Sequence, residues 1–357
     1  MKSTLYSLII CLFTFTVVNA QDYPFIPDSL QLISQSELMK NPPPVDLDPV
    51  YFEDGTKTTL QEVMPLIMQQ KLKPLMFVDA AGNYRALVVV KPSKKRGEVA
   101  INYENIPESM RGLGYSFGNP KSDTIIIHTQ IGPMMNLLTE EFKSIFTRVG
   151  GLDESKYFII NIHQFQTLNP KKLSEKEISF DEAKAIDKES SRMLKDLVSY
   201  FKSENKTVYV VGLSFGAFAG MDFIAKYGNI ADGYLFMVGR LDMTEKVWQS
   251  FSQGIEATFD EDASTVIIGK KPGELSTINL NKIAAGFGHN RYTALLRDTN
   301  LSNVIYYHGK KDQSVGKLTD KEIEFLESRE ATVKAFDGGH NQTLDHLKEG
   351  LTLLLQE

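Results

Sequence analysis

From residue 124 onward, short apolar runs alternate with longer amphipathic segments. The short runs are rich in β-branched and aromatic residues, a composition that favours buried strands. These runs are Thr124–Ile127, Tyr157–Ile160, Val208–Val211, Tyr234–Val238, Val304–Tyr307 and Thr332–Phe336. Apolar positions at helical spacing predict helices over residues 137–149, 180–201, 217–227 and 343–355. Because strands that alternate with helices are typical of βαβ units, we expect an α/β fold with a mostly parallel sheet flanked by helices.

Two parts of the chain depart from this rhythm. Residues 58–71 have a helical pattern, and the next apolar runs flank Gly82 as in a β-hairpin. We assign them to an N-terminal extension over residues 21–95, although the hairpin could also begin the main sheet. The main domain is then predicted over residues 96–357. Within it, residues 241–303 contain amphipathic pieces without a clear strand–helix unit, which predicts a helical cap inserted at the carboxyl end of the sheet.

The first twenty residues have the layout of a secretory signal peptide. Lys2 precedes an apolar run from Leu5 to Val18, and small residues stand before Gln21 as at a cleavage site. A membrane anchor and acylation at Cys11 are the alternatives, but the run is short for a bilayer span. We therefore expect residues 1–20 to be removed and the mature protein, without a membrane span, to be secreted or periplasmic.

Composition mainly excludes classes of chemistry. Cys11 is the only cysteine, so a chain cut before Gln21 has no disulfide, zinc–thiolate site or cysteine nucleophile. Apolar residues make up 42% of the chain and charged residues 24%, as in a protein with a packed core. A net charge of −6 gives no reason to expect nucleic acid or anionic lipid as a partner.

The sequence Gly212-Leu213-Ser214-Phe215-Gly216 lies between a predicted strand and a predicted helix. A G-x-S-x-G motif in that context forms a tight turn that exposes the serine hydroxyl. Gly212 and Gly216 remove Cβ atoms that would otherwise collide in such a turn. The motif alone also occurs in ordinary glycine-rich loops, so it is the strand–helix context that predicts Ser214 as a nucleophile.

A serine hydroxyl becomes nucleophilic when a histidine accepts its proton and an acid orients that histidine. His340 follows the last predicted strand in a short glycine-rich loop, and Asp312 follows the strand before it. Both should reach the carboxyl edge of the sheet, where Ser214 is expected. Asp242, after the strand Tyr234–Val238, is the alternative acid. With Glu245 three residues later, Asp242 also looks like the N-cap of a helix.

The order Ser214, Asp312, His340 resembles that of the α/β-hydrolase superfamily, and the resemblance extends from about Thr124 to the C-terminus. The segment His128–Pro133 is similar to the family's His-Gly-Gly-Pro type of oxyanion loop, but Thr129, Gln130 and Ile131 replace the usual glycines. The resemblance implies an oxyanion hole formed by the backbone N–H of Phe215 and that of Gln130 or Ile131.

The remaining candidate side chains have less specific roles. We expect His128 to brace the oxyanion loop and His346 to lie on the last helix. His163 either lines the pocket or bonds within its own loop, and Trp248 packs in the cap or lines the pocket. The spacing of His340, Asp345 and His346 matches no standard metal site, so no metal or cofactor is expected.

The sequence and the resemblance together predict a secreted serine hydrolase that cleaves an ester or amide bond of a small molecule or peptide. Ser214 would form an acyl-enzyme, with His340 as the general base and Asp312 orienting the imidazole. Carboxylic esters are the favoured substrates. Aminopeptidase-like activity and acyl transfer to another alcohol stay open, and a non-catalytic binding protein on the same scaffold is the alternative from another class.

Overall fold

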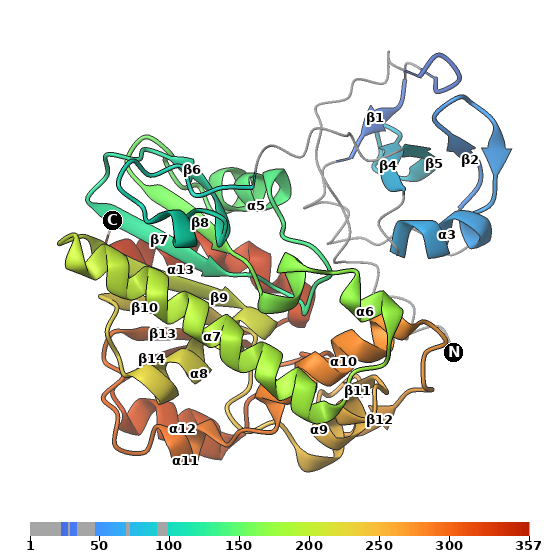
Figure 1. Ribbon diagram of the computed structural model, residues 1–357. Helices are drawn as coiled ribbons and strands as arrows, with labels where there is room; N and C mark the ends of the chain where they lie inside the picture. The colour runs from blue at the N-terminus through green and yellow to red at the C-terminus, as the bar shows by residue number, and fades with distance from the viewer. Residues whose placement is uncertain (1–22, 28, 34–46, 69–71, 91–98, 357) are drawn as a thin grey trace. The chain divides into compact units, whose positions relative to one another are not determined.

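The computed structural model describes residues 23–27, 29–33, 47–68, 72–90 and 99–356 (Figure 1). The predicted leader and Cys11 lie outside these ranges, as does the predicted boundary between residues 95 and 96. The chain divides into two compact units between residues 98 and 99. None of the helices in the described ranges is long and apolar enough to cross a membrane.

The N-terminal unit is built on its own five-stranded sheet, in the order β1-β4-β5-β2-β3. Its elements are β1 (Gln31–Leu32), β2 (Val50–Phe52), β3 (Lys57–Thr58), α3 (Leu60–Met68), β4 (Lys73–Val78) and β5 (Tyr84–Val90). Strands β4 and β5 form the predicted antiparallel hairpin, with Gly82 at φ +81° in its turn. Met76 and Leu87 pack with α3 on one face, and Phe77 and Val88 pack in a second cluster. The hairpin therefore belongs to this unit and not to the main sheet.

The second unit contains a seven-stranded sheet in the order β14-β13-β10-β9-β7-β8-β6. All neighbours are parallel except β6, which pairs antiparallel with β8. The strands are β6 (Gly114–Gly118), β7 (Thr124–Thr129), β8 (Phe158–Ile162), β9 (Thr207–Leu213), β10 (Gly233–Met237), β13 (Val304–Gly309) and β14 (Thr332–Phe336). This order and direction are those of the α/β-hydrolase fold, as predicted.

Helices cover both faces of this sheet because its strands are apolar on both sides. Along β7, Ile125 and Ile127 pack with α7 (Phe180–Ser203) and α8 (Phe215–Tyr227), whereas Ile126 packs with α5 (Glu140–Ser144) and α13 (Leu347–Leu355). Figure 1 shows α7 in front of the sheet and α13 behind it. The alternation of strand side chains between faces thus produces three layers.

Three helix predictions need correction at their ends. The predicted helix over 137–149 begins at Glu140 and becomes π-helical over Ile145–Val149. The final helix is preceded by a 3-10 turn over His340–His346, so His346 lies in that turn instead of in α13. Helix α8 begins at Phe215, directly after the candidate nucleophile.

The predicted insertion over 241–303 contains helices together with a small hairpin. Its elements are α9 (Glu245–Ser252), β11 (Ala257–Phe259), β12 (Val266–Ile268), α10 (Leu275–Gly288) and α11 (Tyr292–Leu295). The antiparallel β11–β12 pair was not predicted. Helix α10 is fixed to the loop before α7, since the buried Asn279 side chain accepts from Ile178 N at 2.9 Å and Lys282 Nζ lies 2.7 Å from Ile178 O. The insertion is therefore firmly attached to the main domain.

Candidate active site

Ser214 sits in a strained turn between β9 and α8. Its φ of +56° and ψ of −120° lie in a region that side-chain-bearing residues rarely adopt. A Cβ at Gly216 would lie 2.0 Å from the backbone oxygen of Thr129, and one at Gly212 would lie 2.4 Å from Gly216 O. Helix and sheet can therefore approach this closely only because both positions are glycine, which is the packing that the motif predicted.

The structure brings Ser214, His340 and Asp312 into one hydrogen-bonded chain. His340 Nε2 lies 2.8 Å from Ser214 Oγ, and His340 Nδ1 lies 2.8 Å from Asp312 Oδ2. His340 is the first residue of the 3-10 turn after β14, and Asp312 follows β13 by three residues. The three side chains meet because the carboxyl ends of parallel strands share one edge of the sheet.

The carboxylate of Asp312 is held on both of its oxygens. Oδ1 accepts from the backbone N–H groups of Ser314 at 2.9 Å and Val315 at 3.1 Å, which leaves Oδ2 for His340. The side chain of Asp312 is only 2% exposed, so this orientation is fixed by protein contacts. The arrangement favours the imidazole tautomer in which Nδ1 donates to Asp312 and Nε2 accepts from Ser214.

The pKa of His340 reflects two opposing effects. Burial acts to lower the pKa, but the negative charge of Asp312 and its hydrogen bond act to raise it. The net result is a pKa above the ordinary value of histidine. The imidazole is thus a stronger base than an isolated buried histidine would be.

Asp242, the alternative acid, is engaged elsewhere. Its carboxylate accepts from both the backbone N–H and the hydroxyl of Thr293 in the insertion. Helix α9 has Thr244 as its N-cap residue, without a side-chain capping bond, so the interpretation of Asp242 as an N-cap was wrong. It failed because a partner 51 residues away competes for the same carboxylate.

Thr129, the last residue of β7, and the next two residues, Gln130 and Ile131, form a tightly braced segment. Thr129 Oγ1 donates to Gly216 O at 2.8 Å. Gln164 Nε2 donates to the carbonyl oxygens of Gln130 at 2.8 Å and Ile131 at 3.0 Å. The Thr129 hydroxyl and the Gln164 amide therefore fix the backbone of this segment by side-chain hydrogen bonds.

His128 lies behind that segment in a buried position. Its Nδ1 lies 2.8 Å from Asn161 Oδ1, its ring stacks on Phe142, and burial lowers its pKa to about 4. The Asn161 amide in turn donates to Gln130 Oε1 at 3.3 Å. A neutral His128 thus braces the loop through Asn161, as predicted.

The other singled-out residues have packing or local roles. His163 Nδ1 lies 2.6 Å from Thr167 Oγ1, which favours the interpretation of His163 as a hydrogen-bonded loop residue. Trp248 stacks on Phe180 with ring centroids 6.0 Å apart, and His346 stacks on Phe336 at 4.5 Å. Within the described ranges no group of three or more His, Cys, Asp or Glu side chains could hold a metal ion.

Sequence reasoning missed the buried ion pair between Arg240 and Glu322, whose side chains are 4% and 3% exposed. The only sequence signal is Thr319-x-x-Glu322, which predicts a helix cap and gives no sign of burial.

Comparison with known proteins gives structural likeness only. No model of a known protein family matches the chain, and no curated protein matches its sequence. A solved structure from a study of LipS and LipT, two metagenome-derived lipolytic enzymes, is 10% identical, covers 69% of this chain and 98% of its own, and has a TM-score of 0.44. A bromoperoxidase from Bacillus anthracis is 13% identical and covers 68% of this chain and 95% of its own, also with a TM-score of 0.44. MGS-M2, an α/β hydrolase from a Medee basin deep-sea metagenome library, is 12% identical and covers 68% of this chain and 92% of its own, with a TM-score of 0.44.

Proposed function

We propose that this protein is a serine hydrolase that cleaves carboxylic esters through an acyl-enzyme on Ser214. The observation that carries this proposal is the chain of two 2.8 Å contacts that joins Ser214 Oγ, His340 and the buried Asp312. An oriented base beside a hydroxyl on a strained turn is the arrangement that activates serine for attack on a carbonyl.

The reaction follows from the positions of the protons. His340 Nε2 takes the Ser214 proton as Oγ bonds to the carbonyl carbon, and the carbonyl electron pair moves onto oxygen. Asp312 stabilises the positive charge of the imidazolium that results. The electron pair on the oxyanion then re-forms the carbonyl, the bond from that carbon to the alcohol oxygen breaks, and the imidazolium gives its proton to the departing alcohol. A water molecule attacks the acyl-enzyme with His340 again as base, which releases the acid and restores Ser214.

The oxyanion would be bound by backbone N–H groups near the turn. Phe215 is the first residue of α8, so its N–H has no acceptor within the helix. The second donor is the N–H of Gln130 or Ile131, whose carbonyl groups are held by Gln164. In enzymes of this kind, removing one such donor costs about 3–4 kcal/mol of transition-state stabilisation.

We further propose that the enzyme works after export. The support is the leader-like sequence of residues 1–20 and the absence of any other cysteine than Cys11. Comparing the N-terminus of the protein secreted by an expressing cell with the encoded one tests this directly. A mature chain that begins at Gln21 supports export, and a cell-associated chain that retains Met1 contradicts it.

Labelling with a fluorophosphonate tests the nucleophile. Wild type and Ser203→Ala, which removes an exposed hydroxyl at the end of α7, should both be labelled, with the added mass on the peptide that contains Ser214. Ser214→Ala should not be labelled. Resistance of the wild type, in a tube where a known serine hydrolase reacts, favours a non-catalytic binding protein and refutes the proposal.

A substrate panel separates the candidate activities. p-Nitrophenyl esters and aminoacyl anilides are offered to the wild type and to Ser214→Ala, with and without a short alcohol as acyl acceptor. Faster turnover of esters than of anilides supports the esterase proposal, whereas the reverse favours aminopeptidase-like activity and ester formation with the alcohol favours acyl transfer. Hydrolysis that continues undiminished in Ser214→Ala excludes Ser214 as the nucleophile.

A further inference from the structure

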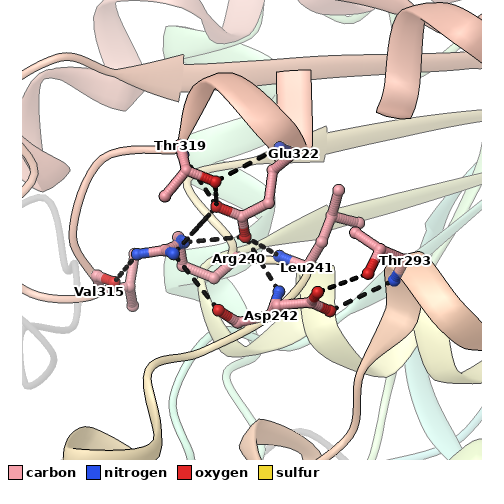
Figure 2. A network of polar contacts seen from close by, with 7 residues as sticks. All are labelled: Arg240, Leu241, Asp242, Thr293, Val315, Thr319 and Glu322. Atoms are coloured by element: carbon pink, nitrogen blue, oxygen red, sulfur yellow. Dashed lines mark hydrogen bonds and ion pairs between the residues drawn. The ribbon is translucent and has the colours of Figure 1, made fainter. Parts of the chain in front are cut away.

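A buried ion pair joins the segment after β10 to the start of α12 (Asp320–Ser328), as Figure 2 shows. Arg240 Nε lies 3.0 and 3.1 Å from the two carboxylate oxygens of Glu322, and Arg240 Nη2 lies 2.9 Å from Oε2. Removing both charges from water in this way is costly, and apolar side chains of similar size are often as stabilising. What apolar side chains could not reproduce is the set of directed hydrogen bonds that the pair makes with its surroundings.

Glu322 uses the same carboxylate to fix two backbone segments. Oε1 accepts from the N–H groups of Leu241 at 3.0 Å and Asp242 at 2.9 Å, while Oε2 accepts from Thr319 N and Thr319 Oγ1, each at 2.8 Å. Burial acts to raise the pKa of Glu322, but Arg240 and these hydrogen bonds hold it below the ordinary value. The side chain is therefore an anion at neutral pH, with both oxygens occupied.

Arg240 also reaches the turn that carries Asp312, through Nη1. Nη1 donates to Val315 O at 3.4 Å, and the N–H of that same Val315 donates to Asp312 Oδ1 at 3.1 Å. The turn closes through Gly316 N, which donates to Asp312 O at 3.0 Å. Arg240 thus holds the carbonyl group of Val315, while the N–H of Val315 orients the Asp312 carboxylate that contacts His340.

The segment after β10 also joins the two ends of the insertion. Arg240 Nη2 donates to Asp242 O at 3.3 Å, and the Asp242 carboxylate bonds Thr293 near the end of the insertion (Figure 2). Leu241 O accepts from the N–H of Tyr292 at 3.2 Å. One guanidinium group therefore lies between the base of the insertion and the turn 312–316.

We propose that Arg240, held in place by Glu322, is a positioning residue that keeps Asp312 aligned with His340 and links that alignment to the base of the insertion. The inference rests on the proposed function of Ser214, His340 and Asp312. Arg240 touches none of the reacting atoms and acts only through Val315.

Arg240→Lys is the variant that tests this proposal. Lysine keeps the positive charge beside Glu322 but lacks the planar fork that reaches Val315 O and Asp242 O together. We expect kcat to fall about ten- to a hundredfold, the size of effect that a small misplacement of a catalytic group produces, with KM within about twofold of wild type. Because Asp312 raises the pKa of His340, its misalignment should also move the acidic limb of the kcat/KM profile to lower pH.

The matched control is Lys282→Met. Lys282 is also a largely buried cation, 10% exposed, and fixes the insertion through Glu177 and Ile178 O, so its ammonium group bonds to the loop before α7 and not to the turn 312–316. Lys282→Met should leave kcat within about threefold of wild type and the acidic limb of the kcat/KM profile unchanged. If Lys282→Met moves the limb as far as Arg240→Lys does, general loosening of the insertion explains the effect and the proposal is wrong.

An NMR titration of His340 separates this inference from the proposed function, because it requires no turnover. The His340 signal is assigned as the one missing from His340→Gln, and its pKa should be lower in Arg240→Lys than in wild type. If the wild type is never labelled at Ser214, the proposed function fails while this titration still decides the role of Arg240. Should Arg240→Lys not fold, Glu322→Gln takes its place. A folded variant with unchanged His340 titration and unchanged kcat overturns the proposal.

Discussion

Replacing Asp312 with asparagine should nearly abolish activity, because the surrounding turn dictates how the new amide lies. Two backbone donors, Ser314 N and Val315 N, point at the position of Oδ1. The amide oxygen must occupy that position, so the amide NH₂ faces His340 Nδ1. The imidazole can then only accept at Nδ1, which puts its proton on Nε2 and leaves no acceptor for the Ser214 hydroxyl.

The size of the loss follows from the cost of turning the amide over. In the flipped orientation the correct tautomer returns, but the NH₂ group faces both backbone donors and leaves two buried N–H groups unpaired. At about 1–3 kcal/mol for each unpaired group, the flip costs about 2–6 kcal/mol. If only flipped molecules react, kcat falls by about 30-fold to about 3 × 10⁴-fold, at 1.36 kcal/mol per factor of ten.

The assay is the steady-state hydrolysis of a p-nitrophenyl ester by wild type, Asp312→Asn and Asp242→Asn. Asp242→Asn serves as the control because Asp242 bonds Thr293 and not His340, so its kcat should stay within about threefold of wild type. Asp312→Asn must fold, which near-ultraviolet circular dichroism checks. A folded Asp312→Asn with more than about one tenth of the wild-type kcat would refute the reasoning, and so would a larger loss in Asp242→Asn.

Two further changes test the packing around the site. Gly216→Ala places a Cβ 2.0 Å from Thr129 O and should lower the free energy of unfolding by about 1–3 kcal/mol and reduce fluorophosphonate labelling. Gly112→Ala, with no atom within 4 Å of its Cβ, should change neither. Equal urea midpoints for the two variants would contradict this prediction. Asp187 is buried near the carboxylate of Asp222, and burial together with that charge raises its pKa well above 3.8. The folded state therefore binds a proton that the unfolded state releases, so stability is lost as pH rises above about 4. Asp187→Asn should be more stable than wild type at pH 8 and gain less at pH 4, as thermal unfolding at the two values will show; a constant difference would exclude the titration of Asp187 as the cause.

The sequence predicted the parts of the fold that depend on local patterns. Buried parallel strands read as apolar runs, and the chain order of those strands placed Asp312 and His340 at the edge where Ser214 lies. Strand β6 (Gly114–Gly118) was missed because it is short and glycine-ended at the sheet edge. The three-residue strands β11 and β12 were missed because so short a run has no periodicity to recognise.

Long-range polar contacts could not be predicted from the sequence, for a different reason. Ser179-x-x-Glu182 and Thr319-x-x-Glu322 are the same capping signal, and both form capping boxes. Yet the Glu182 side chain is 46% exposed, while that of Glu322 is 3% exposed against Arg240. What distinguishes them is that the segment after β10, which carries Arg240, lies against the start of α12. Asp242 was misread in the same way, since its partner Thr293 lies at the far end of the insertion.

The positive φ of Ser214 has a consequence for how such a chain drifts under mutation. Holding a serine in this conformation costs about 1–3 kcal/mol, more than the roughly 0.5–1 kcal/mol by which glycine is otherwise disfavoured. Glycine at residue 214 would therefore make the protein more stable, and a lineage selected for folding or for passive binding alone would drift toward it. Ser214 thus occupies a position where glycine would favour stability, and the hydroxyl is what that substitution would remove.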